Sequence, residues 1–529
     1  MPNDCISYQK SGYFSPLMND YLDQNPKLQS LYHRFPSIEN FEAQIAEKQT
    51  TFNSSHRNSL VSVLQKQYAE IEISQLTQQN IESLKVENTF TVTTGHQLNL
   101  FSGPLYFLYK IISTINLTTE LKVKYPAYNF VPVYWMATED HDFEEINYFN
   151  FRGRKFRWNT ASTGPVGRLS TEGLADFFEI FEQELGHSTN AETLKKLFED
   201  AYLKHNKLAD ATRYLANTLF GAHGLIIIDA DEADLKQHFA PYIKEELLQQ
   251  TAHKKVTETT EKLSAYNIQV NPREINLFYI EDNLRERIVY ENGKYIVNNT
   301  KLEFSESEIL ALADSNPEKF SPNVIMRPLY QEVILPNLCY IGGGGEIAYW
   351  LELKSFFDAV KVSFPILLVR NSVLLVTEKQ AKKASKLDLS WSDLFSKQID
   401  LVNAKAKVLS EIDIDLSALK NQLESQFSIL HEITAKTDPS FAGAVKAQET
   451  KQLKGLENLE KRLLKAQKIK LKDTLSRITD LQNELFPNQS LQERQANFSE
   501  FYIESGELLI NKLIEKLKPL EQSFDIITL

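Results

Sequence analysis

The chain has 529 residues, of which 42% are hydrophobic and 24% charged, so it can bury a sizeable core and is not wholly disordered. The 58 Lys and Arg against 70 Asp and Glu give a formal net charge of −12. This charge argues against nucleic acid as a partner, but it leaves room for a local basic pocket that binds a small anion. The two cysteines, Cys5 and Cys339, exclude a disulfide framework and a CxxC metal clamp.

No targeting or membrane signal is visible in the sequence. The first residues lack a basic stretch followed by an apolar run, and no run of 18 apolar residues occurs. We therefore expect a cytoplasmic protein with reduced cysteines and without a membrane partner.

A strand, a helix and a second strand are predicted in the first third of the chain. Residues 1–85 have the pattern of helices with polar faces, and the β-branched residues 89–94 then indicate a strand. Pro104 opens an apolar-periodic helix over residues 105–121, and the apolar residues 130–136 form the next strand. This βαβ order favours a parallel sheet with a right-handed crossover.

More βα units follow up to residue 390. They are a ribbon over 146–165 that turns at Gly153, helices over 170–220 and 323–335, strands at 225–229, 339–341 and finally 365–370, and a hairpin within 277–297 that turns at Asn292-Gly293. These units predict an α/β fold with a doubly wound sheet. Its domain spans residues 1–390, with insertions at about 146–220 and 275–320.

The sequence becomes helical from residue 391 onward. Apolar residues recur every three or four positions on both sides of Asp438-Pro439, a pair that suits the start of a helix. We predict a coiled-coil hairpin over 391–486, with arms of roughly 45 residues, and a helical segment over 487–529. A hairpin of this length has only one seam between its arms, which favours a homodimer through a second copy of the chain. Alternatively, the hairpin packs on the core of its own chain.

The segment between the first predicted strand and helix is the first candidate site. Ligands of open α/β sheets bind beyond the carboxyl ends of strands, and a helix start offers free N–H groups to phosphate or carboxylate. We expect a phosphate at 102–104, with His96 stabilising its charge. Alternatively, His96 only caps the loop and Lys110 is a solvated helix residue. The candidates in this segment are His96, Gln97, Asn99, Ser102, Gly103 and Lys110.

An acidic cluster, Glu139-Asp140-His141-Asp142, follows the second predicted strand. Carboxylates this close together need a cation nearby, which could be a metal, a substrate amine or Arg and Lys side chains. Carboxylates stabilise an imidazolium, so His141 or Asp140 is a candidate general base and the cluster a candidate ammonium site. No second His stands at i+4 and no Cys is near, so we assign no metal. The alternative is an acidic, solvated turn.

A third candidate is the glycine loop at 342–346, with two arginines from other segments. Successive glycines let the backbone approach a ligand closely, and we select Gly343, Gly344 and Glu346. An ordinary tight turn is the alternative. Arg327 and Arg370 are candidate clamps for carboxylate or phosphate. Cys339 suits a buried structural role better than that of a catalytic thiol.

Taken together, three segments resemble the family of bacillithiol biosynthesis cysteine-adding enzymes, BshC. They are TTGHQLNLFSGPLYFLYKIIS, VPVYWMATEDHDFEEIN and SPNVIMRPLYQEVILPNLCYIGGGGEIAYW. The chain departs from the common family pattern at His96, where Gln is usual, and at Gly344, where Pro is usual. The resemblance implies a Rossmann-like core, similar to class I nucleotidyltransferases, with a coiled-coil dimerisation hairpin.

The resemblance also implies a reaction, the addition of L-cysteine to glucosaminyl-malate to give bacillithiol. An adenine nucleotide, ATP or ADP, is expected as cofactor, with the need for Mg²⁺ left open. In this hypothesis the 102–104 helix start, His96 and Lys110 hold an activating phosphate. Residues 139–142 bind ammonium groups, and Arg327 or Arg370 holds the malate carboxylates. The alternatives are a related ligase for another amine and acid, and a non-catalytic coiled-coil scaffold.

Overall fold

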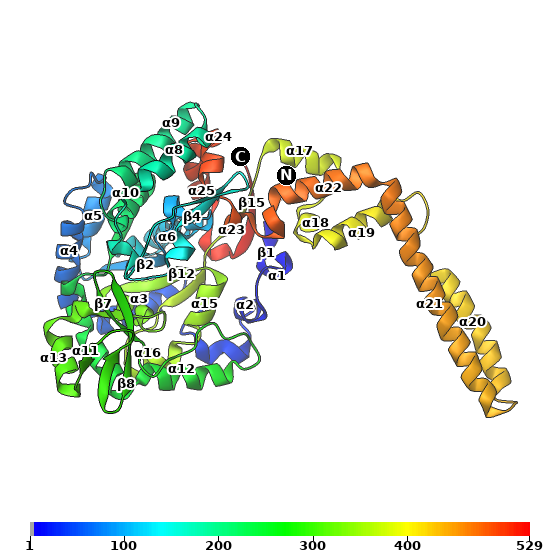
Figure 1. Ribbon diagram of the computed structural model, residues 1–529, viewed down its shortest axis with the longest axis horizontal. Coiled ribbons are helices and arrows are strands. Elements are labelled where there is room, and N and C mark those ends of the chain that lie inside the picture. Colours follow the sequence, from blue (N-terminus) through cyan, green and yellow to red (C-terminus); the bar gives the residue numbers. More distant parts are fainter. Residues whose placement is uncertain (1–4) are drawn as a thin grey trace.

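Five parallel strands form the central sheet of the computed structural model, which describes residues 5–529 (Figure 1). In spatial order they are β13 (Ile366–Val369), β12 (Asn337–Gly342), β2 (Thr89–His96), β3 (Asn129–Met136) and β6 (Ile226–Asp229). All five lie where the apolar runs predict strands. In chain order this is the Rossmann arrangement, whose direction of winding reverses between β2 and β12. The predicted α/β fold is therefore confirmed.

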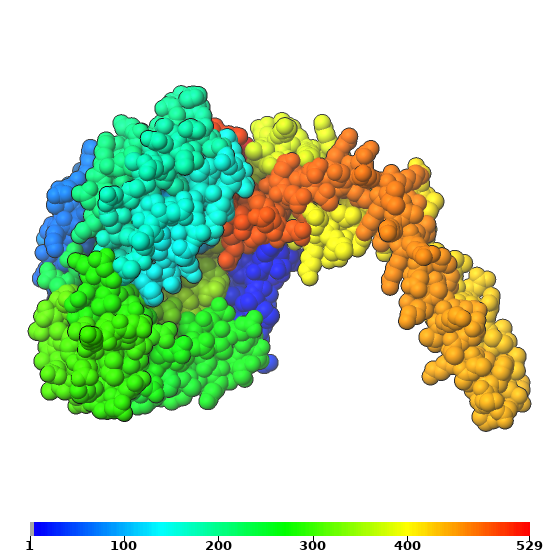
Figure 2. All heavy atoms as spheres, viewed as in Figure 1, coloured from blue at the N-terminus to red at the C-terminus, as the bar shows by residue number. Residues whose placement is uncertain are grey.

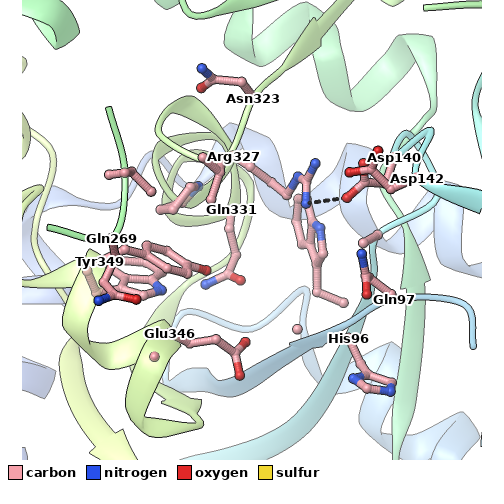
Figure 3. Close-up of a pocket in the computed structure, with 18 of the residues that line it drawn as sticks. His96, Gln97, Asp140, Asp142, Gln269, Asn323, Arg327, Gln331, Glu346 and Tyr349 are labelled. Carbon is pink, nitrogen blue, oxygen red and sulfur yellow. Dashed lines mark ion pairs between the residues drawn. The ribbon is translucent and has the colours of Figure 1, made fainter. Parts of the chain in front are cut away.

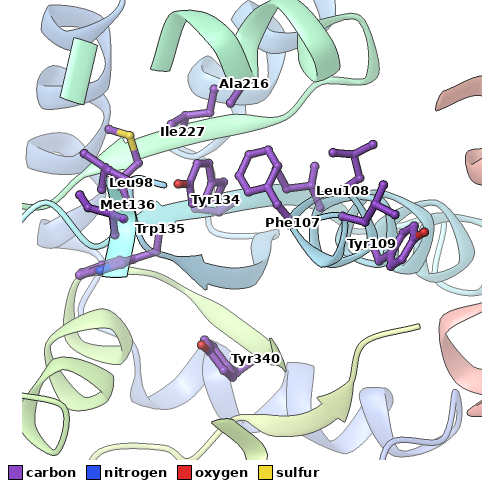
Figure 4. Close-up of a cluster of buried hydrophobic side chains, with 14 of the residues drawn as sticks. Leu98, Phe107, Leu108, Tyr109, Tyr134, Trp135, Met136, Ala216, Ile227 and Tyr340 are labelled. Carbon is purple, nitrogen blue, oxygen red and sulfur yellow. The ribbon is translucent and has the colours of Figure 1, made fainter. Parts of the chain in front are cut away.

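Helices cover both faces of this sheet. The long helix α6 (Tyr106–Lys124) packs on β2 and β3, α3 (Asn40–Thr51) on β12, and α4 (Ser55–Gln67) and α10 (Leu208–Phe220) on β6. Figure 4 shows Phe107 of α6 beside Tyr134 on one face, whereas Trp135 and Tyr340 turn to the other face. Neighbouring side chains of a strand point to opposite faces, so β3 supplies an aromatic residue to each layer.

Two insertions add β-structure beside the central sheet. The first carries the ribbon β4 (Tyr148–Phe151) and β5 (Arg154–Arg157), which turns at Gly153 as predicted. The second is an antiparallel sheet in the order β10 (Glu303–Phe304), β9 (Lys294–Val297), β8 (Leu284–Glu291), β7 (Leu277–Glu281) and β11 (Phe320–Pro322). Asn292 and Gly293 join β8 to β9 at φ values of 52° and 78°, the left-handed conformation that such a hairpin turn requires.

A third sheet joins the two ends of the chain, in the order β1 (Cys5–Ser7), β15 (Ser523–Thr528) and β14 (Ser372–Val376). The prediction that residues 365–370 hold the final strand is therefore wrong. The predicted strand stops at Arg370, and the apolar residues after Asn371 form a further strand, β14, that the prediction missed. Residues 487–529 are also not helical throughout, because they end in β15.

The remaining helices flank these sheets. In the N-terminal part they are α1 (Tyr8–Ser11), α2 (Pro16–Leu22) and α5 (Gln75–Ser83), and around the insertions α7 (Phe143–Ile146), α8 (Leu174–Leu185), α9 (Thr189–Phe198), α11 (Ala233–Gln249), α12 (Thr251–Lys262) and α13 (Glu306–Ser315). Near the glycine loop are α14 (Met326–Ile334), α15 (Gly344–Trp350) and α16 (Lys354–Ala359), and the C-terminal part adds α17 (Glu378–Lys386), α18 (Trp391–Phe395), α23 (Gln492–Gln495), α24 (Ser499–Ser505) and α25 (Leu508–Lys516).

A helical arm projects from this body, and Figure 2 shows its outer part standing clear of the rest. Its helices are α19 (Gln398–Val408) and α20 (Ser417–Thr434) on the way out, and α21 (Pro439–Lys470) and α22 (Lys472–Leu485) on the way back. Asp438 caps α21 by accepting the N–H of Ser440 at 2.9 Å, as the sequence predicts. Among residues 5–529, no helix is long and apolar enough to cross a membrane.

Candidate active site

A cavity of about 740 Å³ opens at the carboxyl ends of β2 and β12, where the winding of the sheet reverses. Such a reversal is the usual ligand site of open α/β sheets. The end of β2, the loop after β3, the second sheet, α14 and the glycine loop all contribute to its wall. Figure 3 shows Glu346, Gln269 and Tyr349 facing Asp140, Asp142 and Gln97 across the cavity.

The structure brings most of the predicted site residues together. Ten of them line the cavity: His96, Gln97, Lys110, Asp140, His141, Asp142, Arg327, Gly343, Glu346 and Arg370. Gly344 lines a smaller cavity next to it. The other four, Asn99, Ser102, Gly103 and Glu139, line neither.

Asp140 lies between two arginines. Its carboxylate oxygens are 3.6 Å from NH1 of Arg327 and 3.9 Å from NH1 of Arg285. Burial raises the pKa of Asp140, but the two guanidinium groups outweigh burial and lower that pKa below its usual range. Asp140 is therefore a stable anion and a poor proton acceptor at neutral pH.

His141 is held in one tautomer by Arg285. NH1 of Arg285 donates to Nδ1 of His141 at 2.6 Å, so the proton of a neutral ring lies on Nε2. In that state His141 presents an N–H donor to the cavity. The geometry therefore favours hydrogen bonding to substrate over the predicted role of general base. Burial and the nearby Arg327 lower the pKa of Arg285 to about 10, which still leaves it charged.

Glu139 turns away from the cavity into the interior. It forms an ion pair with Lys236, whose Nζ also lies 3.1 Å from Asp231, and both partners are nearly inaccessible to solvent. Burial raises the pKa of Glu139. The predicted ammonium site therefore loses this carboxylate, because Glu139 pairs with Lys236 in the interior whereas Asp140 faces Arg285 and Arg327.

Lys110 and Glu346 form the opposite wall. Nζ of Lys110 lies 2.6 Å from Oε2 of Glu346 and donates to the carbonyl of Gly95 at 2.7 Å. Tyr340 and the N–H of Gly343 donate to the same carboxylate at 2.8 and 2.9 Å. Lys110 is thus buried and paired, and the alternative of a solvated lysine is wrong.

His96 is buried beside this pair. Burial lowers the pKa of His96 well below its usual value, and the charge of Lys110 adds to the effect. The ring is therefore neutral at physiological pH, and its Nε2 has no hydrogen-bond partner in residues 5–529. Such a ring contributes no positive charge to a bound anion.

The start of α6 is closed to ligands, contrary to the expected phosphate site at 102–104. Nδ2 of Asn497 donates to the carbonyls of Phe101 and Gly103 at 2.8 and 2.6 Å, and the N–H of Leu105 donates to Ala496 at 2.9 Å. A phosphate needs N–H donors, and the N–H of Leu105 is taken by Ala496 whereas that of Gly103 donates to the carbonyl of Leu100 at 2.9 Å. Asn99 is turned to Glu145, whose carbonyl accepts from its Nδ2 at 3.2 Å.

The cavity is strongly cationic although the chain is acidic. Within the described residues, its lining has seven basic side chains against three carboxylates, those of Asp140, Asp142 and Glu346. The basic residues are Lys110, Arg273, Arg285, Arg287, Arg327, Arg370 and Arg494. Clustered charge of one sign in a cleft attracts ligands of the opposite sign, so the site suits an anion with more than one charged group.

Sequence reasoning missed four of these arginines. Arg285 and Arg287 stand two residues apart on β8 and face the cavity together, which the predicted hairpin could have indicated. Arg273 precedes β7, and Arg494 comes from α23 near the end of the chain. No local pattern connects either of these two with the cavity.

No group of three or more His, Cys, Asp and Glu within residues 5–529 is placed to hold a metal ion. Cys339 lies in β12 and is inaccessible to solvent. Burial raises the pKa of its thiol well above the usual value, which fits the predicted structural role and not that of a nucleophile.

Glu352 supports the cavity wall and makes a pH-dependent contribution to stability. Its Oε1 accepts the N–H of Gln269 at 2.8 Å, and burial raises its pKa from 4.5 to about 7. The stability linked to a raised carboxyl pKa is present at pH values below 4.5 and is lost as the pH rises through 7. Glu352→Gln should therefore increase the free energy of unfolding over that of the wild type, and this increase should be about 2 kcal/mol larger at pH 8 than at pH 5.

Urea denaturation at the two pH values measures this difference. Glu82→Gln, on the exposed face of α5, is the control and should show none. An equal effect of Glu352→Gln at pH 5 and pH 8 would contradict the assignment.

Comparison with known proteins decides the family. The N-terminal Rossmann-like domain of bacillithiol biosynthesis BshC matches residues 1–371, and the C-terminal coiled-coil domain of the same family matches residues 373–529. The chain belongs to the BshC family. The family resemblance seen in the sequence is thereby confirmed, as is the expectation of a ligase of bacillithiol biosynthesis.

Proteins named BshC from several bacteria match this chain along nearly its whole length. A protein of Flavobacterium johnsoniae named "Putative cysteine ligase BshC" is 71% identical and covers 100% of both chains. Proteins of the same name from Flavobacterium psychrophilum and Cytophaga hutchinsonii are 66% and 38% identical, covering 100% and 97% of this chain and 99% and 96% of their own.

Proposed function

We propose that this BshC protein joins the carboxylate of L-cysteine to the amine of glucosaminyl-malate and so forms bacillithiol. The observation that carries the proposal is the cavity at the reversal of the sheet, with its seven basic side chains. Glucosaminyl-malate brings two malate carboxylates, and cysteine brings a third. A cationic cavity fits such substrates, whereas a scaffold protein has no need of one.

The wall around Asp140 suits both charged parts of the acceptor. Arg327 and Arg285 hold Asp140, and with the exposed Arg287 they offer guanidinium groups to the malate carboxylates. Asp140 and Asp142 provide negative charge on the same side for the sugar ammonium. An amine of this kind, with a pKa of about 8, loses its proton readily near neutral pH, so a strong protein base is not required.

Amide formation in water requires an activated carboxylate, and a nucleotide such as ATP would supply the leaving group. The residues present fit an anionic group at the glycine-loop side of the cavity. Nε of Arg370 and Nε2 of His96 are buried there without hydrogen-bond partners among the described residues. Lys110, Arg370 and Arg494 would hold phosphate oxygens in that position.

Mass spectrometry of purified protein with cysteine and glucosaminyl-malate, with and without ATP and Mg²⁺, tests the function. We expect a product with the mass of bacillithiol, formed only with ATP. Product formed without ATP would overturn the activation step. Failure with these substrates in every condition, but condensation of another amine and acid, would overturn the substrate assignment.

We also propose that the arm forms a homodimer. Within α20 and α21 only Phe427 and Val445 are buried, so the hairpin has little core of its own. Large apolar side chains remain exposed on it: Leu419, Ile429, Leu430, Ile433, Phe441 and Leu459. A second copy of the arm would cover them.

Light scattering measures the mass in solution. We expect twice the chain mass for the wild type and a monomer for the double variant Ile429→Lys/Ile433→Lys. The control Ser428→Lys changes an exposed polar position that lies outside this apolar stripe of the same helix and should remain dimeric. A monomeric wild type would refute the proposal.

A further inference from the structure

A second, smaller cavity of about 150 Å³, called the annex below, adjoins the cationic cavity. Five residues line both: Gln269, Gly343, Gly345, Arg370 and Arg494. The annex therefore begins where the glycine loop and the two arginines meet. Its other residues come from the N-terminal segment, α15, the end of β13, the start of β14 and the start of α23.

The volume of the annex limits what it can hold. A cavity of about 150 Å³ holds a molecule the size of benzene, which has six non-hydrogen atoms. Cysteine has seven such atoms and glucosaminyl-malate has about three times as many, so only the amino acid has the right size. The larger cavity, at about 740 Å³, has room for the sugar acid.

One part of the annex wall is apolar and consists of Phe14, Met18, Ala348, Val369 and Leu491. Polar residues, Ser15, Ser372 and Glu493 among them, form the rest. A thiol is weakly polar and packs well against aromatic rings and thioethers, whereas a longer or charged side chain would not fit these walls. The side chain of a bound cysteine therefore suits the interior.

The mouth of the annex carries the polar groups that an amino acid needs. Arg370 is only 3% exposed, and its NH1 and NH2 bind Glu493 at 3.1 and 2.7 Å. Its Nε has no partner in residues 5–529 and lies 3.8 Å from where a side chain at Gly343 would begin. The exposed Arg494 lies beside it and forms no ion pair with any of residues 5–529.

Gln269 supplies the complementary group. Its Nε2 donates to the carbonyl of Asn267 at 3.2 Å, which leaves Oε1 free to accept from an ammonium group. This oxygen lies 4.0 Å from where a side chain at Gly345 would begin, so the glycine loop leaves the mouth open. A cysteine whose side chain points inward would thus have its carboxylate beside Arg370 and Arg494.

We infer that the annex is the cysteine subsite, with the thiol inside and the carboxylate at the mouth, facing the larger cavity. This inference rests on the proposed function. The reacting carboxylate then lies on the border between the two cavities, where an amine bound in the larger one can reach it. The amide bond forms between that carboxyl carbon and the sugar nitrogen. The bond from the carbon to the activated oxygen breaks, this oxygen leaves with its phosphate-containing group, and the nitrogen releases one proton to water.

Ala348→Leu tests the placement by filling the annex without touching the larger cavity. We expect the KM for cysteine to rise at least tenfold while the KM for glucosaminyl-malate stays within twofold. Val324→Leu, at an exposed position that lines only the larger cavity, is the matched control and should leave the cysteine KM unchanged. An unchanged KM for cysteine in a folded Ala348→Leu protein would overturn the inference.

A series of amino acids tested on the wild type avoids any question of folding. We expect 2-aminobutyrate, which has the size of cysteine, to compete with cysteine and not with glucosaminyl-malate. Phenylalanine and tyrosine should not compete. Equal competition by the aromatic amino acids would overturn the annex assignment although the enzyme makes bacillithiol, whereas a wild type that makes no bacillithiol in any condition would instead refute the proposed function.

Discussion

Replacing Arg327 by glutamine should lower kcat/KM for glucosaminyl-malate by roughly 10- to 100-fold, mainly through KM. A hydrogen bond to a charged group is worth about 1.5–3 kcal/mol, and Arg327 offers its guanidinium to the proposed malate site. Arg327 is also one of the two cations that keep Asp140 ionised. Steady-state kinetics at fixed ionic strength measure the effect.

Two comparisons make this prediction specific. An acceptor that carries the sugar amine but no malate carboxylates should react at similar rates with the wild type and with Arg327→Gln. Arg154→Gln removes an exposed arginine that pairs with Glu184 outside the cavity, and it should behave like the wild type. If Arg327→Gln lowers kcat/KM for the malate-free acceptor as much as for glucosaminyl-malate, Arg327 does not bind malate.

The largest loss of stability is expected for Arg370→Met. The side chains of Arg370 and Glu493 are 4% and 1% exposed and form a two-bond ion pair between the end of β13 and α23. Removing one partner of a buried pair leaves an uncompensated charge and costs about 3–5 kcal/mol. Denaturation by urea should show this decrease in the free energy of unfolding.

A double substitution distinguishes the loss of the ion pair from the cost of leaving Glu493 buried as an unpaired charge. Arg370→Met/Glu493→Leu removes both charges and should recover most of the loss, because the apolar pair needs no compensation. Lys382→Met, in an exposed pair with Glu378, is the control and should change stability by less than about 1 kcal/mol. A loss below 1 kcal/mol for Arg370→Met would contradict the buried ion pair.

The central sheet could be predicted because buried parallel strands appear as continuous apolar runs. The main error in the fold is a missed strand. The predicted last strand ends at Arg370, and the short apolar run beyond Asn371 forms β14 of another sheet. Hairpin turns and helix caps, such as Asn292-Gly293 and Asp438, depend on local geometry and were predicted correctly.

The candidate site was predictable mainly where it follows the ends of strands. Asp140, His141 and the glycine loop meet there because parallel strands end at one edge. Contacts between distant segments account for the rest. Asn497 closes a helix start almost 400 residues away, and Arg494 reaches the cavity from the same segment. Glu139 turned inward because a buried lysine, Lys236, was available from α11.

The most direct test of this account is a crystal structure of the enzyme with glucosaminyl-malate. We predict density in the cationic cavity, with the malate carboxylates within hydrogen-bond distance of Arg327 or Arg285 and the sugar amine directed toward the mouth of the annex. Density for the ligand in another part of the molecule, such as a separate cavity that residues of α17, α25 and β15 line, would contradict the account.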